Sequence, residues 1–174
     1  MHDEREVIRG FIAGNHGCFE ELIVKYRGSA TSFARKYVHD PFVAEDIVQE
    51  SFAEIYVYRQ RYKEGYSFKT YLFSIVKHKC IDYIRKNKAI PMDVLPESAG
   101  DDLEKVVLAR EKGNLLRDKM KQLKKEYQVV LHLVDLEGFS YSETAQIMGK
   151  NVGQVRILLF RARRKLKALV ESEV

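Results

Sequence analysis

The chain has 174 residues, of which 45% are hydrophobic, and its formal net charge is +5. This apolar content is sufficient for packed cores in one domain or two small ones, and it excludes a chain that is disordered throughout. The two cysteines, Cys18 and Cys80, are isolated from each other and from His/Cys clusters, so the sequence predicts no metal site and no redox centre.

The start of the chain is charged and has no signal peptide, and the longest strongly apolar run, residues 71–76, is too short to span a bilayer. We therefore expect a cytoplasmic protein without stable membrane insertion. We also expect no cofactor, because no motif in the sequence is typical of cofactor binding.

Helical spacing of apolar residues runs through most of the chain, and strand signals are almost absent. The N-terminal half predicts four helices, at residues 3–13, 16–38, 41–60 and 67–88. The C-terminal half predicts four more, at residues 103–121, 124–136, 140–149 and 152–171. Between the halves, residues 91–102 contain two prolines and other turn formers without an apolar period, which is typical of a linker.

The charge distribution supports the same division. Residues 1–90 carry 15 Lys/Arg against 12 Asp/Glu, residues 91–108 carry 1 against 5, and residues 109–174 carry 14 against 8. We therefore predict an all-α fold of two small helical domains, residues 1–90 and 109–174, joined by a flexible acidic linker at residues 91–108. Two basic domains predict two contacts with nucleic acid.

The helix at residues 41–60 has an apolar and an acidic side. Asp40 and Pro41 are typical of the N-cap and first position of a helix. The residues expected on the buried side are Phe42, Ile47, Val48, Phe52 and Ile55. The residues expected on the polar side are Glu45, Asp46, Gln49, Glu50 and Glu54. Spacing alone favours a solvated face here over a docking surface for a basic partner.

Aromatic and basic residues alternate in the segment at residues 62–88. Its predicted core stripe consists of Leu72, Ile75, Val76, Cys80 and Ile84, with Phe73 and Tyr83 beside it. Three aromatic residues near the helix start, Tyr66, Phe68 and Tyr71, are left over next to cations. Aromatic stacking with backbone attraction is how proteins hold unpaired strands, so the segment indicates single-stranded or melted DNA. A tyrosine-rich edge of the core would give a similar pattern.

Residues 139–166 have the pattern of a helix-turn-helix. Ser140 and Glu143 have the spacing of a capping box, and Gly149 suits the left-handed position that ends a helix. In the second helix, an apolar stripe that includes Val155 and Leu159 is expected to be core. Residues 152–171 also contain six Lys/Arg against one Glu, which predicts contact with DNA phosphates.

Two bulky apolar residues, Ile157 and Phe160, fall on the water-facing side of this second helix. Such residues call for a partner, which is either a thymine methyl group or a protein surface.

The order of these segments resembles the bacterial extracytoplasmic-function (ECF) sigma factors, the small two-domain group of the sigma-70 family. Residues 40–52 resemble the family's region 2.2, residues 68–86 resemble regions 2.3 and 2.4, and residues 127–166 resemble region 4. The resemblance implies a protein that is not an enzyme but binds core RNA polymerase, through the β′ clamp helices and the β flap, and places it on promoter DNA. It also implies an anti-sigma factor as a further partner.

The resemblance implies three sets of site residues. Docking on core polymerase is expected from Asp46, Gln49 and Glu50. Recognition and melting of the −10 element, with a base flipped into a pocket near residues 62–71, is expected from Phe68, Lys69, Tyr71, Lys77, His78 and Arg85. Recognition of the −35 element is expected from Gln154, Arg156, Ile157, Phe160, Arg161 and Arg164.

The sequence departs from the family pattern at several of these positions. Tyr71 stands where the family usually has Trp, Ser74 replaces Arg, and His78 replaces Asn. Ile157 and Leu158 replace polar residues of the recognition helix.

Two other classes of protein were weighed against the sigma factor. A stand-alone helix-turn-helix regulator would leave the segment at residues 62–88 unexplained. A nuclease would need clustered carboxylates for metal ions, which the sequence does not show.

Overall fold

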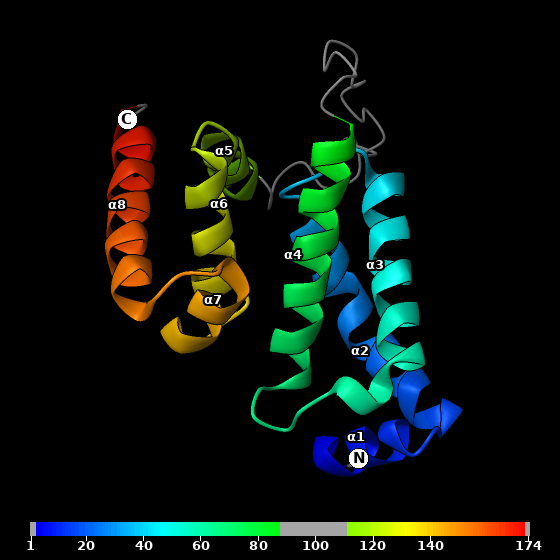
Figure 1. Cartoon of the computed structure of the whole chain (residues 1–174). Coiled ribbons are helices and arrows are strands. Elements are labelled where there is room, and N and C mark those ends of the chain that lie inside the picture. The colour runs from blue at the N-terminus through cyan, green and yellow to red at the C-terminus, as the bar shows by residue number, and fades with distance from the viewer. Residues whose placement is uncertain (1–2, 88–110, 173–174) are drawn as a thin grey trace. The chain divides into compact units, whose positions relative to one another are not determined.

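The structure is a computed structural model that describes residues 3–87 and 111–172, with the side chains of residues 111–114 left undescribed. Every secondary-structure element in these two ranges is helical (Figure 1). The chain divides into two compact units, which correspond in the main to the helices of these two ranges and are described separately. The predicted linker at residues 91–108 and the first part of the helix predicted at 103–121 lie outside the described residues.

The N-terminal unit contains the four predicted helices, and each begins where a polar side chain caps it. They are α1 (Glu4–Ile12), α2 (His16–Ala34), α3 (Pro41–Val57) and α4 (Phe68–Lys86), with a short 3-10 helix η1 (Arg59–Arg61) after α3. The capping side chains, which accept a backbone N–H from the first turn, are those of Asp3, Asn15, Asp40 and Ser67. These caps explain why the helix starts were predicted to within one residue.

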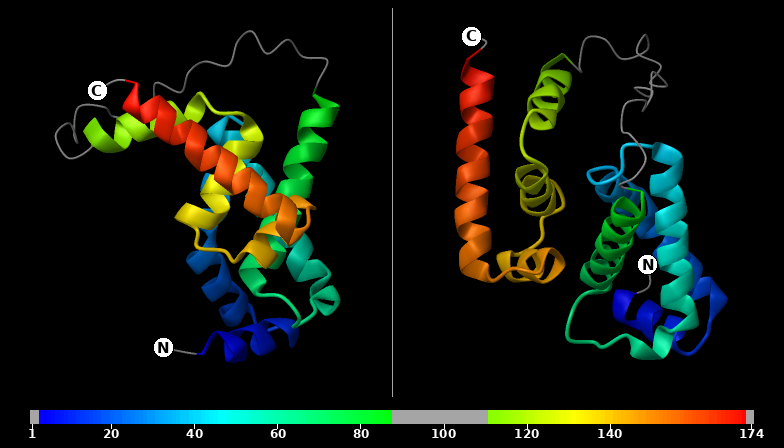
Figure 2. Two further views of the ribbon diagram at one scale, coloured as in Figure 1. Left: turned by 90° about the vertical axis from the view of Figure 1, so that its left-hand side faces the viewer. Right: turned by 45° about the horizontal axis from the view of Figure 1, so that its top comes forward.

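Helices α2, α3 and α4 pack pairwise against one another, and α1 packs against α2 and η1 (Figures 1 and 2). Aromatic side chains form much of the core between them. The rings of Phe33 and Phe73 stack with their centroids 4.8 Å apart, and Phe11 meets Phe68 edge-on at 5.9 Å. Fixed contacts of this kind add to the free energy gained from burying the rings.

The core corrects one site prediction, because Phe68 is fully buried and is not available to stack on a base. It is the first residue of α4, immediately after the Ser67 cap. Its ring packs against Phe11 of α1 and lies with its centroid 5.7 Å from that of Tyr26 in α2. The Phe68 side chain belongs to the first residue of a helix, but neighbouring helices enclose it.

Helix α3 corrects a second prediction. Ile47, Val48, Phe52 and Ile55 are buried as expected, but Phe42 is 77% exposed. Residues four and seven apart lie on the same side of a helix. Phe42 precedes Asp46 by four residues and Gln49 by seven, so it lies on the polar side and not with the core stripe.

The C-terminal unit contains α5 (Glu111–Lys121), α6 (Lys125–Leu131), a π-helix η3 (His132–Leu136), α7 (Tyr141–Met148) and α8 (Val152–Glu171). The helix predicted at residues 124–136 is therefore present, but its last part widens into a π-helix. Helix α8 packs against α5 and α6. Its buried residues, Val155, Leu159 and Ala162, all belong to the predicted apolar stripe.

The burial of Phe68 predicts a large effect on stability. Replacing Phe68 with Ala should lower the free energy of unfolding by about 3–5 kcal/mol, because it removes a fully buried ring and leaves a cavity. Urea unfolding followed by circular dichroism measures this loss. The matched control is Tyr66→Ala, since Tyr66 is 50% exposed and the change should stay within about 0.5 kcal/mol. Equal effects of the two substitutions would contradict the buried position of Phe68.

Candidate nucleic-acid interface

Helices α7 and α8 form a helix-turn-helix whose turn is fixed by caps. The Ser140 hydroxyl accepts a hydrogen bond from the Glu143 N–H at 3.0 Å, and the Glu143 carboxylate accepts one from the Ser140 N–H at 3.0 Å. Gly149 ends α7 in the left-handed region, with φ 67°. The predicted capping box and the predicted glycine position are both confirmed. This turn sets the direction in which α8 leaves α7.

The outward side of α8 carries cations and two bulky apolar groups. Ile157 is 55% exposed and Phe160 is 65% exposed, as the sequence predicts. Arg156, Arg161 and Arg164 are also exposed. The Arg156 guanidinium lies 6.0 Å from the centre of the Tyr141 ring in α7. All five side chains of the predicted −35 set from 156 to 164 are therefore available at the surface.

Gln154, the sixth member of that set, has a structural role that the sequence analysis missed. Asn151 caps α8, with its side chain accepting from the Gln154 N–H at 2.8 Å. In return, the Gln154 side-chain oxygen accepts from the Asn151 N–H at 3.0 Å. The capping box uses the amide oxygen of Gln154, so the amide NH₂ is the group available to donate to a binding partner.

Arg163 differs from its neighbours on α8 because it is bound within the protein. Its Nε and Nη2 atoms donate to the two carboxylate oxygens of Asp135 at 3.1 and 2.5 Å. These hydrogen bonds to Asp135 raise the pKa of the Arg163 guanidinium. The pair ties α8 to η3, so Arg163 positions the helix while Arg161 and Arg164 face solvent.

Three residues of the predicted −10 set share one side of α4. Tyr71, His78 and Arg85 are spaced by seven residues, which places them on one face of a helix. Tyr71 is half-buried, and His78 and Arg85 are exposed. The structure does not bring Lys69 to this face, because Lys69 directs its ammonium group over the Phe73 ring at 5.7 Å. Lys77 adjoins His78 in sequence and lies about 100° further round the helix.

Tyr71 lies in an aromatic and basic environment. Its ring meets the ring of Tyr62 edge-on, with centroids 5.3 Å apart. Burial, together with the charge of Glu54, raises the pKa of Tyr71, and the charge of Arg61 lowers it. Arg61 also lies 4.1 Å from the centre of the Tyr58 ring, which is 45% exposed. Tyr58 and Arg61 were missed because they lie outside the segment in which aromatics and cations alternate.

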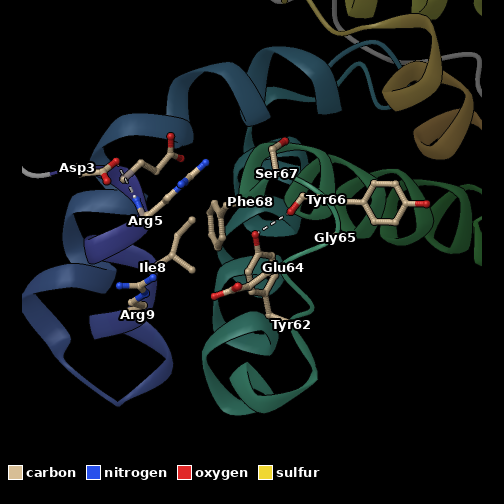
Figure 3. Close-up of a pocket in the computed structure, with 11 residues that line it drawn as sticks. Asp3, Arg5, Ile8, Arg9, Tyr62, Glu64, Gly65, Tyr66, Ser67 and Phe68 are labelled. Carbon is tan, nitrogen blue, oxygen red and sulfur yellow. Dashed lines mark hydrogen bonds between the residues drawn. The ribbon is translucent and has the colours of Figure 1, made fainter.

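A hollow of about 600 Å³ lies between the start of α1 and the segment leading into α4 (Figure 3). From α1 it is lined by Arg5, Ile8 and Arg9, and from the other side by Tyr62 and Tyr66. The Tyr62 hydroxyl donates to the Tyr66 carbonyl at 2.8 Å, which holds the loop in shape. The contribution of α1 was not predicted, because more than 50 residues separate it from this loop and no sequence pattern links them.

Glu4, at the edge of the same hollow, accepts a hydrogen bond from the Tyr26 hydroxyl and pairs with Lys25 at 3.2 Å. Burial and this hydrogen bond raise the pKa of Tyr26. The carboxylate of Glu4 is thereby engaged by other residues of the protein. The other charged residues that line the hollow are Arg5 and Arg9, together with Asp3 and Glu64.

The outward side of α3 combines unpaired acidic residues with exposed apolar ones. Asp46, Gln49 and Glu50 are all exposed, as expected. Within the described ranges, neither Asp46 nor Glu50 has an ion-pair partner. Phe42 at one end of the helix and Val57 at the other are 77% and 66% exposed. We call these five residues the α3 face.

Residues 3–87 and 111–172 contain no group of three or more His, Cys, Asp or Glu side chains that could hold a metal ion. They also include no helix that is both long and apolar enough to cross a membrane. Neither Cys18 nor Cys80 forms a disulfide in the described ranges, and Cys80 is buried while Cys18 is partly exposed.

Both units match family models. Residues 22–90 match Sigma-70 region 2, and residues 113–166 match Sigma-70, region 4. Among curated proteins, the chain is 29% identical to the ECF RNA polymerase sigma factor SigM of Bacillus subtilis, over 89% of this chain and 96% of SigM. It is 28% identical to the RNA polymerase sigma-H factor of Pseudomonas aeruginosa, over 97% of this chain and 95% of that protein.

Two solved structures share the fold. One is the sigma factor RpoE in complex with the anti-sigma factor NepR from Bartonella quintana, with a TM-score of 0.70 and 21% identity over 88% of this chain and 96% of that one. The other is CnrH in complex with the cytosolic domain of CnrY, with a TM-score of 0.73 and 22% identity over 98% and 99% of the two chains.

A helical unit that matches region 2, followed by a helix-turn-helix unit that matches region 4, defines a two-domain sigma factor. The chain belongs to the ECF group of the sigma-70 family, and it is an RNA polymerase sigma factor that directs transcription initiation.

Proposed function

We propose that the protein binds core RNA polymerase and brings it to promoters that carry a −35 and a −10 element. Residues 1–90 would dock on core polymerase and open the −10 element, residues 109–174 would anchor on the −35 element, and residues 91–108 would connect the two. The observation that carries the proposal is the face of α4 with Tyr71, His78 and Arg85. A regulator that binds only duplex DNA has no need of an aromatic and basic surface of this kind.

Opening of the −10 element is proposed for this face and the adjoining aromatic side chains. Flipping a base out of the duplex costs a few kcal/mol, and stacking on an aromatic side chain returns about 1–3 kcal/mol per base. Tyr71 is half-buried, so part of its ring is accessible for such stacking, and its ring also contacts the ring of Tyr62. The 600 Å³ hollow beside Tyr62 and Tyr66 is large enough for one base, and its lining offers both donors, Arg5 and Arg9, and carboxylates, Asp3, Glu4 and Glu64.

Docking on core polymerase is proposed for the α3 face. Its carboxylates are exposed and unpaired within the described residues, so a basic partner could pair with them without breaking an internal ion pair. Phe42 adds a bulky apolar group at one end of the face, and such groups contribute most to binding when a partner buries them. The β′ clamp helices of core polymerase are the partner that family membership favours, with the β flap as a second contact.

Recognition of the −35 element is proposed for the outward side of α8. Arg156, Arg161 and Arg164 supply exposed cations for phosphates and base edges. Gln154, Ile157 and Phe160 complete the surface, with Gln154 near the start of the helix, where recognition helices approach base edges.

An anti-sigma factor is proposed as a further partner. The support is the structure of RpoE with the anti-sigma factor NepR, whose sigma chain shares the fold of this one. We propose the cytoplasm as the site of action, because core polymerase and promoter DNA are found there.

Gel shift and run-off transcription with purified protein test the proposal against a stand-alone regulator. Promoter fragments should be bound and transcribed only when core polymerase is added. Strong specific binding by the protein alone, unchanged by core polymerase, would favour the stand-alone helix-turn-helix regulator and exclude the proposal.

The α3 face gives a prediction for core binding. Phe42→Ala, and separately the double change Asp46→Ala with Gln49→Ala, should each weaken the affinity for core polymerase by about 1–2 kcal/mol, or roughly five- to thirtyfold. Equilibrium binding of labelled protein to core polymerase measures the change. The control is Val24→Ala, an apolar residue that is 71% exposed on α2 and should have no effect. Normal affinity in all variants would exclude docking through this face.

Arg163 and Arg164 are adjacent, but they should respond differently to substitution. Arg164→Ala should remove one phosphate or base contact, so transcription should depend less on the −35 sequence and the salt slope of promoter binding should fall by about 1. Arg163→Ala should instead lower the unfolding temperature of the free protein, because it breaks the bidentate pair with Asp135. Run-off transcription from intact and −35-altered promoters makes the comparison. An Arg164→Ala protein that discriminates between them like wild type would refute a contact there.

A further inference from the structure

Two bulky apolar side chains face outward on a helix that is otherwise strongly basic. Ile157 and Phe160 are 55% and 65% exposed, although the core of the same unit buries Val155 and Leu159 almost completely. Exposed apolar groups of this size within a binding surface gain free energy only when a partner covers them. The cations around them, including Arg161 and Arg164, are exposed as well. A partner that covers Ile157 must therefore be neutral or negatively charged where it meets these cations.

A small hollow lies beside Ile157. It has a volume of about 180 Å³ and is lined by Lys150, Gln154, Ile157, Leu158 and Arg161. Ordinary small-molecule pockets have volumes of about 300–1,000 Å³, so this hollow suits one protruding group better than a free ligand. Two of its lining residues, Ile157 and Leu158, are apolar, while the other three side chains carry hydrogen-bond donors.

The chemistry of the hollow matches one base edge. In the major groove, thymine alone presents a methyl group, and it presents the O4 acceptor beside it. The apolar side chains fit the methyl group, and Gln154 and Arg161 supply donors for the acceptor. Ile157 lies in the second turn of α8, within the N-terminal part of a recognition helix that contacts base edges.

The charge around the hollow favours DNA over a protein as the occupant. Residues 152–171 contain six Lys/Arg against one Glu. Of the four arginines of α8, Arg163 alone forms an ion pair with an acidic side chain in the part of the chain that the structure describes. Phosphates flank every base edge, so a thymine would reach the hollow together with the anions that these cations attract.

We infer that this hollow, through its lining residue Ile157, reads the 5-methyl group of a thymine in the −35 element. The inference rests on the proposed function. It adds that the apolar residues at positions 157 and 158, where the family has polar ones, select a thymine methyl group. Specificity at this base pair then comes from apolar contact with a methyl group, and a base without one is disfavoured.

Replacing thymine by uracil tests this inference, because uracil lacks only the methyl group. The preferred −35 element is first selected with the wild-type holoenzyme from a promoter library randomised over that element. Each thymine on either strand is then replaced singly by uracil. Replacement of one particular thymine should lower run-off transcription at limiting holoenzyme about fourfold relative to the unmodified promoter. This is the loss expected for one buried methyl group.

The Ile157→Ser holoenzyme should use the thymine and uracil promoters equally, which links the lost methyl contact to this side chain. The matched control is Val24→Ser, which also changes an exposed β-branched residue and should keep the wild-type sensitivity to uracil.

Three results would overturn the inference: a selected element without thymine on either strand, a wild-type holoenzyme indifferent to every uracil, or an Ile157→Ser holoenzyme that keeps the sensitivity. The uracil comparison needs only the wild-type protein, so it tests the inference even if the Ile157→Ser variant folds poorly. In each of these cases, the proposed function would still stand if transcription from the selected promoter requires core polymerase. Loss of that requirement would instead refute the proposed function itself.

Discussion

Burial of Phe68 at the first residue of α4 fixes which side of that helix is available for the proposed contact with DNA. The ring is enclosed by α1 and α2, and Leu72 and Val76 continue the buried side along the helix. By helical periodicity, His78 and Arg85 then lie on the side opposite Leu72 and Val76. Tyr71, three residues after Phe68, lies at the edge of that side and is half-buried. The loop before α4 follows from the same anchor, because Tyr62 packs beside Phe68 and its hydroxyl holds the Tyr66 carbonyl. The surface proposed to open DNA is therefore the reverse side of an aromatic core.

The three proposed surfaces differ in how they gain binding free energy. The α3 face offers exposed apolar groups and carboxylates that have no ion-pair partner within the described residues, which suits a protein partner. The outward side of α8 offers cations, which suit duplex DNA, and α4 offers rings and cations, which suit an unpaired strand. If the C-terminal unit anchors on duplex DNA as proposed, it would raise the local concentration of the −10 strand at the N-terminal unit. Stacking would then have to offset only the cost of unstacking a base.

Much of the fold could be predicted because the local signals agree with the tertiary structure. Asp40, Ser140 and Gly149 determine helix ends through contacts within a few residues, and they lie as predicted. Burial was predicted wrongly for residues that contact distant segments or that lie on the other side of their helix. Phe68 was misplaced because its partners belong to α1 and α2. Phe42 was misplaced although its spacing from Asp46 placed it on the polar side. The role of α1 in the hollow and the pairing of Arg163 with Asp135 depend on contacts through space, for which the sequence has no local signal.

Permanganate reactivity of thymines around the −10 element tests the central claim most directly, because permanganate attacks unpaired thymines. The account predicts reactive thymines with the wild-type holoenzyme, and none with core polymerase or the sigma factor alone. A holoenzyme with Tyr71→Ala should still bind the promoter but lose most of this reactivity. Full reactivity with Tyr71→Ala, or opening by the free protein without core polymerase, would contradict the account.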